Sequence, residues 1–142
     1  AGSFLSGLAG QRWPKKNGLV VIYSLRAIAI AALLVADKTA TTIYAFAAVM
    51  GILWLSTVPL TTGIVAQVFG LRFMATLFGF VFLSHQLGSF LGVWLGGYLY
   101  DRTGSYDAVW WTGVALSVAA ALIHVPINER PLRRVLPATA QR

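Results

Sequence analysis

Long apolar runs alternate with short polar connections along the whole chain. The hydrocarbon core of a bilayer is about 30 Å thick, so a helix that crosses it needs roughly 20 mostly apolar residues. Four runs meet this requirement: 17–36, 41–66, 73–100 and 108–127. Residues 1–9 are apolar but too few to cross, and we read them as the end of a further helix. The pattern predicts an all-α membrane protein with four complete transmembrane helices and the end of a fifth.

Composition supports this fold class. The chain is 58% hydrophobic and 11% charged, whereas soluble domains carry about 25% charged residues. A water-soluble globule is therefore excluded, and the lipid bilayer is the expected surrounding. A signal peptide would need a basic segment before its apolar core, which residues 1–9 lack. We expect residues 1–142 to be a fragment of one transmembrane domain, with residues 128–142 as its tail.

The distribution of basic residues predicts the orientation of the spans. The net charge is +7, but the basic residues lie in short clusters between apolar runs, which argues against a nucleic-acid partner. Closely spaced spans alternate in direction, so one side of the membrane collects Arg12, Lys15, Lys16, Arg72, Arg130, Arg133, Arg134 and Arg142. The other side has only Lys38 and Arg102. The positive-inside rule then places the C-terminus in the cytoplasm, and we expect a plasma-membrane location.

Enzyme chemistry lacks its usual residues. The carboxylates lie in connections or in the tail, at Asp37, Asp101, Asp107 and Glu129. Paired-acid hydrolysis, a carboxylate metal cage and a Ser-His-Asp arrangement within the spans are therefore excluded. A phosphate-binding glycine loop followed by lysine is also missing. We expect no enzymatic activity, no metal and no cofactor.

Arg26 lies close to the midpoint of the first span. An arginine at the bilayer centre costs about 2.5 to 3.5 kcal/mol on insertion scales, so such residues normally face a protein interior or a watery cavity. The residue alone leaves two interpretations open. Arg26 is either a structural partner of helix carbonyls or of an acid elsewhere, or a contact for an anionic substrate.

His85 and Gln86 lie near the midpoint of the third span, at a depth similar to that of Arg26. Histidine is the side chain that ordinarily changes charge near neutral pH, so His85 is a candidate for proton uptake and release, with His124 less central. The alternative is a hydrogen bond that holds helices together. Gln86 is turned by about 100° from His85, so the two side chains cannot face one cavity centre equally.

Pro59 interrupts the second span within LSTVPLTTG. Proline has no N–H, so the Leu55 carbonyl loses its helical donor, and we expect Thr57, Thr61, Thr62 or a cavity water to compensate. Pro59 is either an ordinary kink or a bend beside a substrate path, with Thr57 and Thr61 lining that path.

Small residues recur every fourth position in the third span, at Ser84, Gly88, Gly92 and Gly96. They form one bare stripe on the helix, which allows close approach of another helix. The stripe is either a static packing surface or a moving contact between two bundles.

The segment GLAGQRWPKK resembles the cytoplasmic loop motif G-x-L-A-D-R-x-G-R-K of the major facilitator superfamily, at Gly7, Arg12, Lys15 and Lys16. Gln11 and Pro14 depart from that motif. A second passage resembles helices eleven and twelve of the monocarboxylate and oxalate-formate exchanger branches, where a glycine-rich helix ends in G-x-x-x-D-x-T-G-S-Y. The matching residues are Gly97, Asp101, Thr103, Gly104, Ser105 and Tyr106.

This resemblance implies a fragment holding the end of helix eight and helices nine to twelve of a twelve-helix bundle. It implies that the second span lines the cavity, that the third lies between the two halves, and that the first and fourth are outer supports. Arg26 then holds neighbouring helices in register, with helix eight as the suggested partner. His85 gains importance, because the carboxylate exchangers place a cationic residue on its helix.

The expected function is secondary transport of a small solute, most plausibly an organic anion such as a carboxylate, by rocker-switch alternating access. The expected partners are the solute, protons as a candidate coupling ion, and the missing N-terminal half of the same chain. The rival hypothesis is a non-transporting membrane scaffold or assembly subunit. A channel of self-assembled units would need a ring of polar side chains on one span, which the sequence lacks.

Overall fold

The computed structural model describes residues 2–132, and every regular element in this range is a helix. The α-helices are α1 (Gly2–Arg12), α2 (Lys15–Val35), α3 (Ala40–Phe69), α4 (Met74–Thr103) and α5 (Asp107–His124), and the 3-10 turn η1 (Leu71–Phe73) precedes α4. Four helices, α2 to α5, are long and apolar enough to cross a membrane. The predicted fold class, an all-α membrane protein with four spanning helices, is confirmed.

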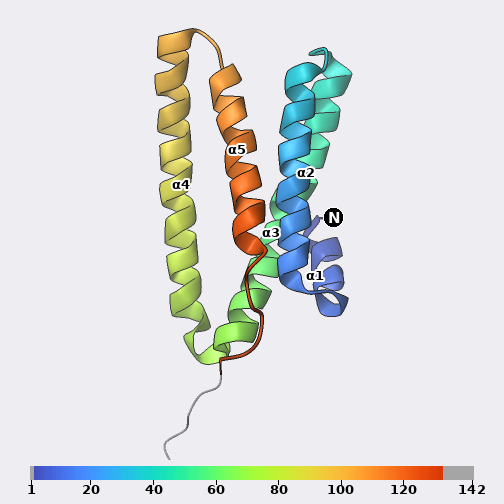
Figure 1. Cartoon of the computed structure of the whole chain (residues 1–142), viewed down its shortest axis with the longest axis vertical. Coiled ribbons are helices and arrows are strands. Elements are labelled where there is room, and N and C mark those ends of the chain that lie inside the picture. The colour runs from blue at the N-terminus through green and yellow to red at the C-terminus, as the bar shows by residue number, and fades with distance from the viewer. Residues whose placement is uncertain (1, 133–142) are drawn as a thin grey trace, which may run out of the picture.

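The helices run up and down along one axis (Figure 1). The C-terminal end of α1, the α3–α4 connection and the segment after α5 lie toward one end, and the α2–α3 and α4–α5 connections lie at the other. Arg12, Lys15, Lys16, Arg72 and Arg130 thus lie toward one end, as alternation of the spans requires. Arg133, Arg134 and Arg142 lie outside the described residues.

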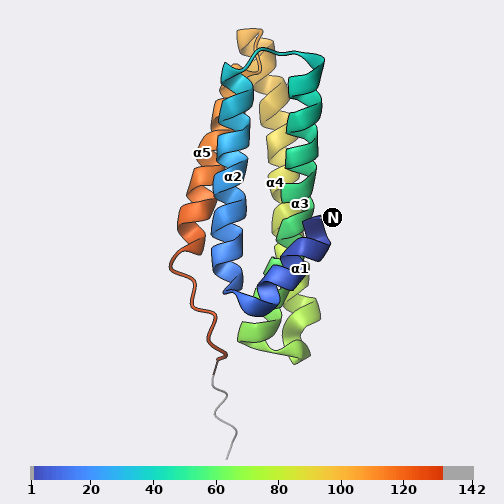
Figure 2. The same ribbon diagram turned by 90° about the vertical axis from the view of Figure 1, so that its right-hand side faces the viewer.

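The helices differ strongly in how they pack. The largest interfaces join α2 with α5, α1 with α3 and α2 with α3, whereas α4 meets α3 and α5 over a much smaller surface. Figure 2 shows α2 beside α5 and α3 beside α4. None of the most apolar 18-residue stretch of α4 is buried. Most of α4 is therefore available to lipid or to another helix.

The buried core lies between α2 and α3. Leu19 and Ile22 of α2 pack with Leu53 and Leu60 of α3. Glycines allow close approach to α3 from two helices: a Cβ at Gly18 of α2 would lie 2.9 Å from Leu60, and one at Gly2 of α1 would lie 2.3 Å from the carbonyl oxygen of Ile52. These apolar contacts position the polar residues of the next section against one another.

Glycine or proline follows the ends of α3, α4 and α5. Gly70 and Gly104 have φ of 77° and 67°, which glycine adopts without the steric cost of a Cβ. Helix α3 extends beyond the predicted span 41–66 at both ends, and helix α4 extends beyond the predicted span 73–100 at its C-terminal end. In contrast, α5 ends at His124 and not at residue 127. Pro126 cannot donate to the Leu122 carbonyl, which accepts from the Val125 N–H instead.

Candidate functional site

Arg26, on α2, bonds to and packs against α3 near the middle of the bundle. Its Nη2 donates a 3.1 Å hydrogen bond to the Leu53 carbonyl, and its guanidinium carbon lies 5.1 Å from the Trp54 ring centroid and 5.3 Å from that of Tyr23. Its Nε is buried and has no hydrogen-bond partner within residues 2–132. The guanidinium therefore depends on one carbonyl and two ring faces. The bonded partner lies on α3, not on α1, the helix suggested by the resemblance.

Trp54 links Arg26 to His85. The imidazole of His85, on α4, lies edge-to-face against the Trp54 ring, with 6.5 Å between centroids. His85 also contacts Phe82, one turn earlier on α4. The sequence placed Arg26 and His85 at similar depth, and the structure adds the aromatic ring between them. We call Arg26, Trp54 and His85 the mid-depth cluster.

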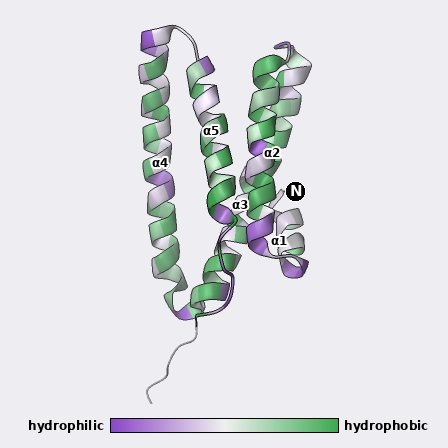
Figure 3. Ribbon diagram, viewed as in Figure 1, coloured by the Kyte–Doolittle hydropathy of each residue, from purple (hydrophilic) through white to green (hydrophobic). Residues whose placement is uncertain are grey.

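His124 extends these contacts to α5. Its ring lies 5.2 Å from the Tyr23 ring, and its Nδ1 is 2.7 Å from the Ala120 carbonyl of its own helix. A continuous series of ring and cation contacts thus joins α5, α2, α3 and α4. Figure 3 shows the hydropathy pattern that surrounds it: the spans are mostly hydrophobic, with short hydrophilic interruptions inside α2 and α4.

The other residues predicted to line the solute path either bond to carbonyls of their own helix or are exposed. Thr57 donates to the Trp54 carbonyl at 2.7 Å and Thr61 donates to the Thr57 carbonyl at 3.0 Å, both within α3. Trp54, Thr57 and Thr61 are three and then four residues apart, so they share one face of the helix. Gln86 is exposed on α4, next to His85 in the chain.

The carbonyl freed by Pro59 has an unexpected donor. The Leu55 carbonyl accepts a 2.9 Å hydrogen bond from the Oγ of Ser3, on α1. The prediction that Thr57, Thr61 or Thr62 supplies this donor is wrong, because each of these hydroxyls reaches only a carbonyl of its own helix three or four residues back. Together with Arg26, Ser3 ties two neighbouring helices to the turn of α3 before Pro59.

The glycine stripe of α4 is open along most of its length. A Cβ at Gly88 or Gly92 would meet nothing within 4 Å among the described residues, and one at Gly96 would lie 3.9 Å from Val109 of α5. Among the described residues, another helix therefore approaches the stripe only at Gly96, where the neighbouring helix is α5. Its role as a moving contact stays a prediction.

The loop motif residues form a polar network at the basic end. Lys15 Nζ donates to Gln67 Oε1 at 2.8 Å, and Gln67 Nε2 donates to the Glu129 carbonyl at 3.0 Å. The Glu129 carboxylate accepts from the Lys16 N–H in the first turn of α2, and Lys16 Nζ donates to the Val125 carbonyl. Neither Gln67 nor Glu129 was singled out from the sequence, since their partners are more than 50 residues away.

The second motif forms the α4–α5 turn at the other end. Thr103 Oγ1 donates to the Leu99 carbonyl and accepts from the Ser105 N–H, while Ser105 Oγ accepts from the Asp107 N–H. Tyr100 and Tyr106 stack with 4.4 Å between centroids. These contacts give the turn a structural role. Arg12 is the last residue of α1 and Asp101 lies in the last turn of α4, whereas Gly7 lies in the middle of α1.

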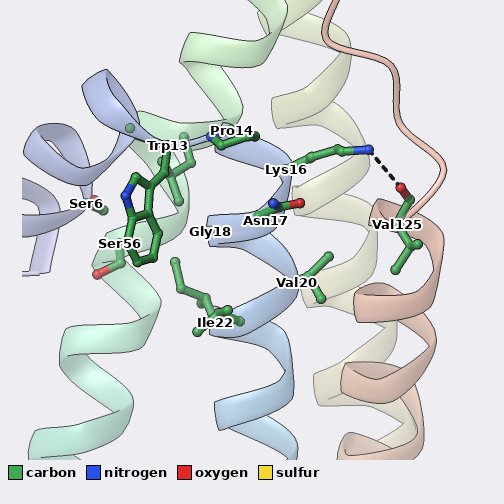
Figure 4. Close-up of a pocket in the computed structure, with 13 residues that line it drawn as sticks. Ser6, Trp13, Pro14, Lys16, Asn17, Gly18, Val20, Ile22, Ser56 and Val125 are labelled. Atoms are coloured by element: carbon green, nitrogen blue, oxygen red, sulfur yellow. Dashed lines mark hydrogen bonds between the residues drawn. The ribbon is translucent and has the colours of Figure 1, made fainter.

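A cavity of about 740 Å³ lies away from the mid-depth cluster. It lies between α1, α2 and α3, with Val125 at one edge, and apolar side chains dominate its wall. Figure 4 shows Trp13 beside Ser6 and Ser56, and the Lys16 to Val125 hydrogen bond at the opposite edge. His85, Gln86, Thr57 and Thr61 do not line it. We therefore base the candidate site on the mid-depth cluster.

Comparison with known proteins identifies the family. The model of the Major Facilitator Superfamily matches residues 1–142. The curated proteins and the solved structures give no significant match. The superfamily consists of membrane transporters, which fits the expectation of no enzymatic activity. The family match and the four spanning helices agree, and the chain belongs to the major facilitator superfamily.

Proposed function

We propose that the chain is the C-terminal part of a twelve-helix secondary transporter that moves a small organic anion, such as a carboxylate. On this proposal α1 is the end of helix eight, and α2 to α5 are helices nine to twelve. The GYLYDRTGSY passage at the end of α4 resembles the monocarboxylate and oxalate-formate exchanger branches and supports a carboxylate solute.

The mid-depth cluster carries the proposal. Arg26 and His85, one fixed cation and one ionisable ring, flank Trp54, while Asp37, Asp101, Asp107 and Glu129 lie at the ends of the helices or beyond them. The ionisable groups inside the spans of this chain are thus exclusively cationic or neutral. Intramembrane charges are costly and mark substrate or ion paths, and a cationic surrounding favours an anionic solute.

The architecture supports alternating access. Substrate sites of such transporters lie near the bilayer midplane, and one bundle rocks against the other around them. The exposed face of α4 at Gly88 and Gly92 is the surface that would meet the N-terminal half, and the stripe continues to Gly96, which is buried against α5. Pro59 would bend α3 beside Thr57 and Thr61, and Gln86 would join His85 at the solute path. His85 is the candidate for proton coupling.

The orientation follows from the charge distribution. The end that carries Arg12, Lys15, Lys16, Arg72 and Arg130 would face the cytoplasm, with the C-terminus on the same side and the protein in the plasma membrane.

The full-length protein in proteoliposomes provides the test. We expect uptake of at least one radiolabelled small carboxylate, competed by other carboxylates and not by sugars or organic cations. His85→Ala should reduce this uptake, whereas Trp94→Phe, at a stacked aromatic elsewhere on α4, should retain it. Uptake of neutral or cationic solutes in place of carboxylates would overturn the anion assignment. Failure to move any solute in the panel would favour the scaffold hypothesis.

A further inference from the structure

The side chain of Trp54 lies between Arg26 and His85, yet neither composition nor motif singled it out. It is 54% exposed even though Arg26 lies against its ring and His85 against its edge. A large aromatic ring that is contacted on two sides and still half-exposed presents one remaining surface. That surface lies on the face of α3 that also carries Thr57 and Thr61.

Arg26 holds Trp54 from two directions. Its hydrogen bond goes to the carbonyl of Leu53, the residue directly before Trp54, and its guanidinium plane lies near the indole ring. One side chain thus restrains both the backbone and the ring of the same turn. Tyr23 lies on the guanidinium as well, which keeps the cation from turning away. A cation–π contact between the guanidinium and the indole face favours one orientation of the ring.

Trp54 also offers an unused donor. Within residues 2–132 its indole Nε1–H has no protein acceptor, and the same is true of the ring nitrogens of His85. Indole N–H is a donor only, so its natural partner is an oxygen such as that of a carboxylate. In Arg26, Nη2 is bonded to α3 and the guanidinium lies against the rings of Trp54 and Tyr23, while its Nε is buried away from the exposed surface of the Trp54 ring.

Resting on the proposed function, we propose that Trp54 is a substrate-contacting residue whose indole N–H donates to the carboxylate of the solute, beside His85. Arg26 is the positioning residue that sets the Trp54 ring and does not itself contact the solute. The substrate class is therefore a carboxylate small enough to be held by Trp54 and His85 together, with an apolar part that packs on the indole ring.

Transport kinetics of the full-length protein test the substrate contact. Trp54→Phe keeps a six-membered aromatic ring for the Arg26 contact and removes the N–H together with the five-membered ring that carries it. KM for the carboxylate should rise about tenfold with little change in kcat, because a hydrogen bond to a charged group is lost. The matched control is Trp94→Phe, which should keep the wild-type KM. An unchanged KM in Trp54→Phe would overturn the substrate contact, whereas lack of carboxylate uptake by the wild type would overturn the proposed function with it.

Fluorescence tests the positioning role without transport. In the full-length protein with every tryptophan except Trp54 changed to phenylalanine, Trp13, Trp94, Trp110 and Trp111 among them, Trp54 is the remaining indole. Carboxylate binding should quench its emission, and Arg26→Met should shift the emission maximum and weaken the quenching, while Arg26→Lys should restore part of the effect. Identical emission and identical carboxylate titration in Arg26→Met would overturn the positioning role. If Arg26→Met does not insert, Tyr23→Leu provides the second variant, with a smaller shift expected.

Discussion

The hydroxyl of Ser3 donates a 2.9 Å hydrogen bond to the carbonyl oxygen of Leu55. These residues lie on different helices, and the carbonyl is the one whose helical donor Pro59 eliminates. The neighbouring carbonyl of Leu53 accepts from Arg26, and that of Trp54 accepts from Thr57. The turn of α3 before Pro59 is therefore satisfied by side chains from three helices, and this arrangement sets the position of Trp54.

Ser3→Ala should destabilise the protein by about 1 kcal/mol, because the Leu55 carbonyl then has no donor in an apolar surrounding. In Pro59→Ala the restored amide can donate to Leu55, so Ser3→Ala should cost much less in that background. Thermal unfolding in detergent of the wild type, the two single variants and the double variant gives the coupling free energy between Ser3 and Pro59. Ser6→Ala is the control, since Ser6 donates within α1 to Ser3. If the effects of Ser3→Ala and Pro59→Ala on stability simply add, Ser3 does not compensate for the hydrogen bond that Pro59 eliminates.

His85→Gln should abolish the pH dependence of uptake by the full-length transporter, because glutamine keeps hydrogen bonding but cannot take up a proton near neutral pH. Initial uptake rates between pH 5 and pH 8 provide the measurement. His124→Gln should keep the pH dependence, since the ring of His124 bonds its own helix and contacts Tyr23. A pH profile that His85→Gln leaves unchanged would dismiss proton coupling at this residue.

Gly92→Leu should impair transport more than membrane insertion. Leucine inserts readily, but its side chain would block close approach of a helix to the open stripe of α4. Surface expression and uptake are measured together. Gly79→Leu is the same-helix control, because Gly79 also faces open space but lies off the stripe. Normal transport by Gly92→Leu would count against a moving contact.

Glu129→Ala should destabilise the protein by about 1 kcal/mol, because the carboxylate accepts from the Lys16 N–H at the start of α2 and complements the helix dipole. Glu129→Gln should cost less, since the amide oxygen still accepts. Thermal unfolding of the wild type and of both variants, at low and at high salt, measures the two losses of stability. High salt should reduce the difference in stability between Glu129→Ala and Glu129→Gln. Equal stability of all three proteins would exclude a capping role.

Residues 1–142 contain no cysteine, so single cysteines introduced here report the orientation once any cysteine elsewhere in the full-length protein has been replaced by serine. A membrane-impermeant maleimide added to intact cells should label Lys38→Cys in the full-length protein and leave Gln11→Cys unlabelled until the membrane is permeabilised. Labelling of both in intact cells, or of Gln11→Cys alone, would refute the cytoplasmic assignment of the basic end.

The sequence predicted the spans well because length and apolar composition alone decide whether a helix can cross a bilayer. Arg26 and His85 were recognisable because ionisable residues are rare there. The donor to Leu55 was missed because local reasoning favours the nearby threonines, whereas the threonine hydroxyls bond their own helix and Ser3 comes from 52 positions away. Trp54 was missed because an aromatic residue in a span ordinarily faces lipid, and only its contacts with two other helices distinguish it.

The chain that follows α5 continues past the start of α2 to the end of α3. Val125 and Glu129 bond there to Lys16, Glu129 also to Gln67, and Leu132 to Val68. For recombinant work this makes the choice of C-terminal boundary consequential. A truncation at His124 would preserve every spanning helix and still leave the first turn of α2 without its carboxylate acceptor. Reporter domains and purification tags are better joined after residue 132, where they leave these bonds intact.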